Sequence, residues 1–167
     1  MMILMRLLHI GGAIFWAGGV LFINTQLGPA VAAIGPQGIP VMIELERRNY
    51  FGRLMFAATI TVLSGLYLVW QDSSGFGGAW SQTRFGMGIS IGMTAAIIAY
   101  IAAILLLRPA MLRVNAVAGQ LAQAGAAERE ALQAEFAVAR GRLMRTGATL
   151  MLFLLVAIIA MATARYL

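Results

Sequence analysis

Four long apolar runs constrain this chain more than any other feature of its sequence. They cover residues 7–31, 54–70, 85–107 and 143–164, with ends that composition places only to within several positions. A bilayer has a hydrocarbon core about 30 Å thick, which a helix of roughly 20 apolar residues crosses. We therefore expect an all-α integral membrane protein, a four-helix bundle that forms one domain over 1–167.

The overall composition excludes the soluble alternatives. Hydrophobic residues make up 61% of the 167 residues and charged residues only 11%. A soluble domain is about 45–50% apolar and about 25% charged, and a chain this short cannot bury so much apolar surface in its own core. Cysteine is absent, which excludes disulfides and thiolate metal sites. The lipid bilayer is the partner that we expect for the outer surface.

The basic residues indicate how the chain is oriented. All 12 are arginine, and they lie mostly at the ends of the apolar runs, which is typical of membrane anchoring and not of nucleic-acid binding. With four spans, Arg6, Arg84 and Arg165 lie on one side of the membrane. The positive-inside rule predicts that both termini lie outside a bacterial-type inner membrane and that the first and third loops are cytoplasmic. Those two loops carry Arg47, Arg48, Arg53, Arg108, Arg113, Arg129, Arg140, Arg142 and Arg145.

The first two connections are short and contain helix breakers. Gly35-Pro36 and Gly38-Ile39-Pro40 end the first helix, and residues 43–53 then read as a short interfacial helix. Glu44 and Arg48 form an i,i+4 pair on it. The second connection, 72–80, is a glycine-rich turn that ends at an interfacial tryptophan.

The third connection predicts a helical hairpin. Residues 109–141 are rich in alanine, glutamate, glutamine and arginine, all good helix formers. Leu132, Phe136 and Ala139 share one helical face. We expect two helices that extend into the cytoplasm between the third and fourth spans and join near Ala124-Gly125. The second helix of the hairpin would continue into the fourth span, so that this helix would be about 35 to 40 residues long.

The single histidine is the principal candidate for chemistry. His9 lies in the first span, and an ionisable residue inside the membrane is a functional candidate by default. Its helical face continues with Gly12, Trp16 and Gly19. Glycines at these steps would leave a flat slot beside the imidazole, as a porphyrin requires, and imidazole is a common ligand of haem iron and of copper.

Two other interpretations of this face remain open. Small residues let membrane helices approach closely, so the glycines and His9 can equally be a packing face. Met2 and Met5 share the face of His9, and thioethers are ligands of Cu(I), so a copper site is an alternative. All six acidic residues lie in the predicted loops, which argues against hydrolysis and phosphoryl transfer as functions of this chain.

Short motifs over residues 5–107 resemble two related membrane families. The first-span motifs resemble the copper-resistance D-like membrane proteins and the HemJ-type protoporphyrinogen oxidases, and those of the second span resemble the HemJ group. Trp80, before the third span, fits both families. The first span contains Leu8-His9-Ile10, Phe15-Trp16-Ala17-Gly18-Gly19 and Leu21-Phe22, and the second region contains Leu45-Glu46-Arg47-Arg48, Gly65-Leu66 and Trp70.

The resemblance implies a haem protein. In the HemJ group the first-span histidine ligates a b-type haem, and His9 matches it. That group also needs a lysine in its third span, which has no counterpart because this chain contains no lysine. Protoporphyrinogen oxidation itself is therefore not implied.

These observations lead us to expect a haem b-binding membrane protein for electron transfer or for redox chemistry on a porphyrin or quinone. His9 would be the axial ligand, and either Met87 or Met93 would supply a sixth ligand or the iron would be five-coordinate. Arg6 and Arg84 lie on the outer side, where haem propionates would avoid hydrocarbon, so we expect at least one of them, Arg84 in preference to Arg6, to pair with a propionate. The alternatives are a copper-handling transport protein and a non-catalytic accessory subunit that binds a second copy or other membrane subunits.

Overall fold

The computed structural model describes residues 1–166, apart from the side chain of Pro36, and this range contains helices and no strand. The first long helix consists of α1 (Met2–Phe22), a π-helical segment (Ile23–Leu27) and α2 (Gly28–Ile34). A 3₁₀ turn (Gly35–Gly38) leads to α3 (Ile39–Arg47), which is followed by α4 (Tyr50–Asp72) and the short α5 (Gly78–Ser81). Helix α6 (Arg84–Ala102), a second π-helical segment (Ala103–Leu107) and α7 (Arg108–Gln123) form another long helix, and α8 (Ala126–Thr163) ends in a 3₁₀ turn (Ala164–Tyr166).

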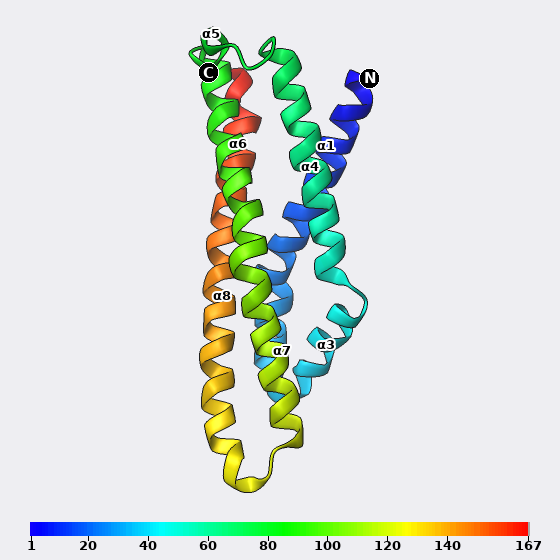
Figure 1. Cartoon of the computed structure of the whole chain (residues 1–167), viewed down its shortest axis with the longest axis vertical. Helices are drawn as coiled ribbons and strands as arrows, with labels where there is room; N and C mark the ends of the chain where they lie inside the picture. Colours follow the sequence, from blue (N-terminus) through cyan, green and yellow to red (C-terminus); the bar gives the residue numbers. More distant parts are fainter. Residues whose placement is uncertain (167) are drawn as a thin grey trace.

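Four of these helices are long and apolar enough to cross a membrane, as the four apolar runs predict. Both termini lie at one end of the molecule together with α5, and we call this the terminal end (Figure 1). The α7–α8 turn lies at the opposite end, the hairpin end (Figure 1). At most a third of the most apolar stretch of each helix is buried inside the chain, so lipid or other helices must cover the rest.

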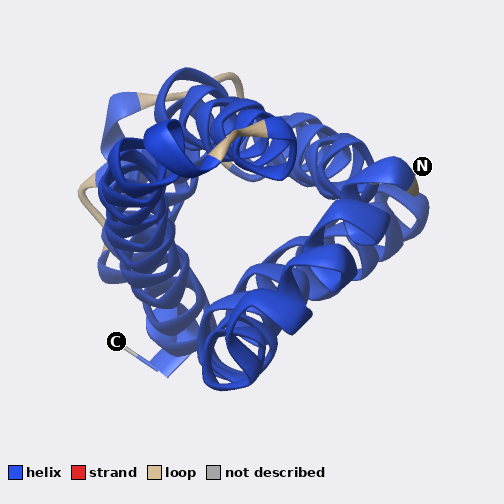
Figure 2. Ribbon diagram, turned by 90° about the horizontal axis from the view of Figure 1, so that it is seen from below, coloured by secondary structure: helices blue, strands red, loops and turns tan. Residues whose placement is uncertain are grey.

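The four long apolar helices form two antiparallel pairs. Helix α1 packs mainly on α4, and α6 mainly on α8. A glycine brings each pair together: a Cβ added to Gly12 would lie 3.0 Å from the carbonyl oxygen of Ala57, and one added to Gly92 would lie 3.0 Å from that of Ala157. Such close backbone approach is the usual basis of helix packing in membranes. Viewed along the bundle, the helices follow three sides of a triangular outline (Figure 2).

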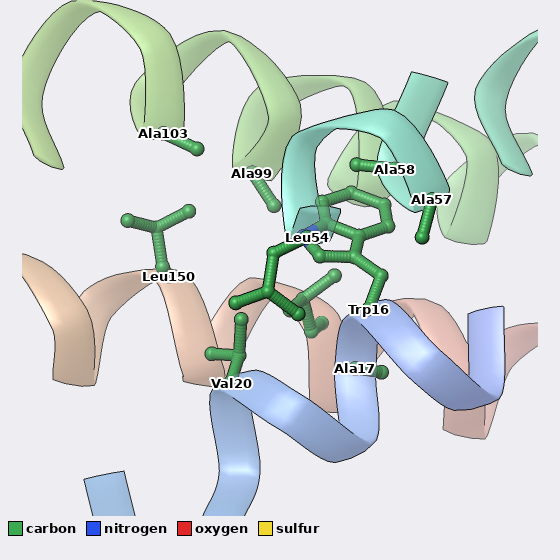
Figure 3. Close-up of a cluster of buried hydrophobic side chains, with 10 residues drawn as sticks. Trp16, Ala17, Val20, Leu54, Ala57, Ala58, Ala99, Ala103 and Leu150 are labelled. Carbon is green, nitrogen blue, oxygen red and sulfur yellow. The ribbon is translucent and has the colours of Figure 1, made fainter. Parts of the chain in front are cut away.

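The two pairs meet in a small core midway along the bundle (Figure 3). Trp16 of α1 reaches Tyr100 of α6 edge-on, with ring centroids 6.4 Å apart and an interplanar angle of 89°. The Tyr100 hydroxyl lies 2.9 Å from the Thr59 hydroxyl of α4. The buried cluster comprises Trp16, Ala17, Val20, Leu54, Ala57, Ala58, Ala99, Ala103, Leu150 and Leu154.

Each π-helical segment ends just before a proline. Pro29 and Pro109 both stand in the first turn of the helix that follows, α2 and α7. Proline has no N–H, and its ring clashes with the carbonyl four residues earlier. A wider turn ahead of the proline lets the long helix continue without a sharp kink.

The interfacial helix lies earlier in the chain than 43–53. It is α3, which begins at Ile39 and ends at Arg47. Asn49, with φ 56° and ψ 40°, then turns the chain into α4. The predicted pair is confirmed, since Glu44 accepts a hydrogen bond from Arg48 at 2.9 Å.

The helical hairpin has the predicted form. Helices α7 and α8 turn at Ala124 and Gly125, and α8 is 38 residues long. An ion pair between Arg113 and Glu135 joins the two helices. The predicted single domain extends to residue 167, which lies outside the described residues.

Candidate functional site

The imidazole of His9 is fixed in one orientation by α4. Its Nδ1 lies 2.8 Å from the main-chain carbonyl oxygen of Thr61. A carbonyl oxygen only accepts hydrogen bonds, so Nδ1 must carry the proton and donate. In the neutral ring this leaves Nε2 with a bare lone pair, and Nε2 has no hydrogen-bond partner within residues 1–166. A ring held in this way by a backbone carbonyl is typical of a metal-ligating histidine.

A glycine on α4 makes room for this ring. A Cβ added to Gly65 would lie 2.8 Å from Cε1 of His9 and 3.0 Å from its Nδ1. The imidazole therefore rests directly on the backbone of α4, one helical turn beyond Thr61. No residue with a side chain could occupy position 65 without moving the ring or the helix.

The carbonyl that orients His9 has a second donor. The Ser64 hydroxyl bonds to the carbonyl oxygen of Ile60 and also lies 3.2 Å from that of Thr61. Ser64 is buried, with 3% of its surface exposed. Thr61, Ser64 and Gly65 together form the surface of α4 that receives the histidine.

The slot predicted beside Gly12 and Gly19 is filled by α4. A Cβ added to Gly12 would lie 2.5 Å from the Thr61 hydroxyl oxygen, and one added to Gly19 would lie 2.6 Å from Cδ2 of Leu54. The Tyr50 hydroxyl also donates to the carbonyl oxygen of Gly19, at 3.2 Å. The two glycines therefore bring α1 against α4 and leave no gap for a porphyrin between them.

Trp16 also lies in the protein core instead of lining a slot. It is 3% exposed and is surrounded by alanines of α4 and α6 (Figure 3). Trp16 is two helical turns from His9, on the side toward the hairpin end. Its indole contributes to packing between the two helix pairs.

The two arginines expected near propionates occupy different places at the terminal end. Arg6 is exposed on α1, three residues before His9. Arg84 is the first residue of α6, and this stretch of α6 packs on the C-terminal part of α8, where Gly88 contacts Ala164. Both views place the N- and C-terminal ends of the chain well apart (Figures 1 and 2). The structure therefore brings Arg6 close to His9 along the chain and does not bring Arg84 there.

The predicted sixth ligands lie on the other helix pair. Met87 and Met93 belong to the part of α6 that packs on α8, and Met87 is 47% exposed. The ring contact between α1 and α6 is at Trp16 and Tyr100, farther toward the hairpin end. Within the described residues, α6 packs mainly on α8, and α1, which carries His9, packs mainly on α4, so neither methionine is brought to His9.

Metal ligands other than His9 are sparse. Among residues 1–166, no group of three or more histidine, cysteine or carboxylate side chains gathers in one place. Met2 and Met5 are half-buried on the same face of α1 as His9. Met5 lies one turn from His9 toward the terminal end, and Met2 lies two turns from it. The donor set of this single chain therefore offers one well-oriented nitrogen and nearby thioethers.

Sequence inspection found the ligand candidate and missed its supports. Thr61 acts through its main chain, which no side-chain motif marks. Gly65 belongs to the Gly65-Leu66 motif of the second span, but nothing in the sequence pairs it with His9, because that depends on the register between α1 and α4. Comparison with known protein families, with curated proteins and with solved structures gives no match.

Proposed function

We propose that the chain is a multi-pass protein of a bacterial-type inner membrane, with its terminal end outside and its helical hairpin in the cytoplasm. The four apolar helices and their exposed apolar surface support insertion in a bilayer. The arginines support the orientation: Arg6, Arg84 and Arg165 belong to the terminal end, and the other nine lie toward the hairpin end.

We further propose that the protein binds haem b through Nε2 of His9. The observation that carries this proposal is the hydrogen bond from Nδ1 to the Thr61 carbonyl, which selects the tautomer in which Nε2 is free to bind iron. The residues present fit this group, because the imidazole of His9 is held with Nε2 free and would be the residue that holds the iron. Haem bound there supplies one-electron transfer within the membrane.

Residues of this chain fix the position and orientation of the His9 imidazole. Gly65 seats the imidazole on α4, and the Thr61 carbonyl prevents it from rotating. Because α4 packs against Gly12 and Gly19, these two glycines would not hold the haem, and the residues that would hold it are His9 and Arg6 near the terminal end of α1. Arg6 is exposed one turn nearer the terminal end, where a guanidinium can bind a propionate carboxylate in bidentate fashion.

Electron transfer is the role that this arrangement supports best. Redox chemistry on a porphyrin or quinone would need a group that takes up protons beside the haem, and the described part of the chain offers no acidic side chain within the spans. The resemblance to the HemJ group supports haem binding, while the missing lysine does not support protoporphyrinogen oxidation.

An absorption spectrum of the protein, purified in detergent from haem-replete cells, tests the proposal. We expect a Soret band and one haem per chain by pyridine haemochrome assay, both lost in His9→Ala. Copper bound without haem would instead support the copper-handling alternative through Met2, Met5 and His9. Neither cofactor, with other subunits co-purifying, would support a non-catalytic accessory subunit.

A further inference from the structure

The two helix pairs of the bundle repeat one another segment by segment. The π-helical segments Ile23–Leu27 and Ala103–Leu107 lie 80 residues apart, and so do the prolines that follow them, Pro29 and Pro109. In both pairs the first helix runs from the terminal end to the hairpin end, and the second helix returns (Figure 1). The aligned residues are mostly different, so the repeat is visible in the structure and not in the sequence.

The contact within each pair is also the same. Gly12 lies against the carbonyl oxygen of Ala57 and Gly92 against that of Ala157, and in both cases an added Cβ would be 3.0 Å from the oxygen. Each glycine also meets the side chain four residues beyond that alanine. Positions on α4 and α8 therefore correspond at a separation of 100 residues. Corresponding residues that are buried in both pairs are Leu54 with Leu154, Ala57 with Ala157, and Ser64 with Ala164.

The contacts between the pairs are those of a two-fold arrangement. Helix α1 contacts α8, and α4 contacts α6. A two-fold axis along the membrane normal exchanges α1 with α6 and α4 with α8, so each of these contacts is the image of the other. Parallel repeats related by an axis of this kind occur in membrane proteins. The single chain therefore has the architecture of a dimer of two-helix units.

The pairs differ at the residues that hold the His9 imidazole. The counterpart of His9 on α6 is Ile89, and the counterpart of Gly65 is Arg165. A Cβ added to Gly65 would lie 2.8 Å from the ring of His9, and Arg165 has a Cβ at the corresponding place. An imidazole at position 89 would therefore lack the room that His9 has. The acceptor is present in both pairs, because the counterpart of the Thr61 carbonyl is a main-chain carbonyl too.

We propose that the two pairs are copies of one two-helix unit, and that His9 and Gly65 are the residues that make the first copy a ligand site. The unit supplies the close helix contact and the carbonyl oxygen, which both copies have. The histidine supplies the ring, and the glycine lets the ring lie with Nδ1 on that carbonyl. The inference rests on the proposed function in one respect only, namely that the imidazole held in this way binds a ligand.

Transfer of these two residues to the second pair tests the proposal. In the full-length protein without haem, Ile89→His with Arg165→Gly should give a second imidazole with the ¹⁵N NMR signature of His9, a neutral ring protonated and hydrogen-bonded at Nδ1. The wild-type chain has one histidine, so the new resonances are assigned directly. Ile91→His with Arg165→Gly is the matched control, because Ile91 is 58% exposed, and its ring should exchange between tautomers.

Two results of this experiment would contradict the proposal. One is a new ring that exchanges between tautomers in the Ile89→His variant, and the other is the same fixed tautomer in both variants. Because the measurement needs no haem, it is separate from the proposed function, which a wild-type protein without a Soret band would overturn.

Spin-label distances test the repeat without any histidine. The chain lacks cysteine, so labelled pairs can be introduced into the full-length protein. Ile14→Cys with Leu63→Cys spans the first pair of helices, Thr94→Cys with Thr163→Cys is its counterpart, and all four positions are exposed. Double electron–electron resonance in nanodiscs should give the same separation for both. The cross pairs, Ile14 with Thr163 and Thr94 with Leu63, should also match each other, and separations that differ within either set overturn the repeat.

Discussion

Nδ1 of His9 donates to the carbonyl oxygen of Thr61 across a separation of 52 residues, at 2.8 Å. This bond links the only histidine of the chain to the neighbouring helix and determines which nitrogen is available to a metal. Its geometry depends on Gly65, over which the ring lies.

Gly65→Ala should displace the imidazole and weaken the proposed haem site. The new Cβ would lie under 3.0 Å from Cε1 of His9, so either the ring or α4 has to move. Overpacking of this kind costs about 1–3 kcal/mol. We expect haem retention to fall at least several-fold in a detergent wash assay. Gly119→Ala is the control, because its added Cβ meets nothing within 4 Å, and equal retention in the two variants would show that the ring does not rest on Gly65.

Two adjacent glycines of α1, Gly11 and Gly12, should differ in their response to the same substitution. A side chain at Gly12 would strike Thr61 and the Ala57 carbonyl, whereas one at Gly11 has open space. Gly12→Leu should lower the free energy of unfolding by about 1–3 kcal/mol or more, and Gly11→Leu should leave it nearly unchanged. Thermal unfolding in detergent measures both. Similar melting temperatures would mean that α1 meets α4 through another face.

Arg6→Gln should shift the midpoint potential of the bound haem or speed its loss. The exposed guanidinium lies one turn from His9 toward the terminal end, and a solvent-exposed ion pair with a propionate contributes up to about 1 kcal/mol. Arg140→Gln, on the hairpin, is the control and should change neither quantity. A potentiometric titration followed at the Soret band separates the two variants, and an identical potential and retention would rule out the propionate contact.

A reporter experiment tests which end of the bundle faces the outside of the membrane. A phosphatase fused at the C-terminus should be active outside the inner membrane, and one inserted between Ala124 and Gly125 should be inactive because that turn lies in the cytoplasm. The reverse pattern would place His9 near the cytoplasmic surface and would contradict the assigned orientation.

Much of the fold could be predicted from the sequence, because a helix can cross a bilayer when its apolar run is long enough, whatever its detailed sequence. The four spans follow from those two properties, and the hairpin follows from helix-forming residues interrupted only at Ala124-Gly125. The start of α3 could not be placed, because Pro40 stands in its first turn and works as a helix starter instead of a breaker.

The site was predictable only in part, since it depends on register between helices. His9 is evident as the sole histidine, but Gly11 and Gly12 look alike in sequence while one is free and the other is packed. Which carbonyl receives Nδ1, and whether α4 fills the space beside Gly12 and Gly19, are properties of the α1–α4 pairing. No pattern within α1 encodes them.

Chemical rescue of His9→Gly tests the central claim most directly. The variant removes the imidazole and leaves a space between α1 and Gly65 that free imidazole can enter. We predict that the purified variant lacks the Soret band of the wild type and regains it when haem and imidazole are supplied together, but not with haem alone. An unchanged Soret band in His9→Gly without imidazole would contradict ligation by His9.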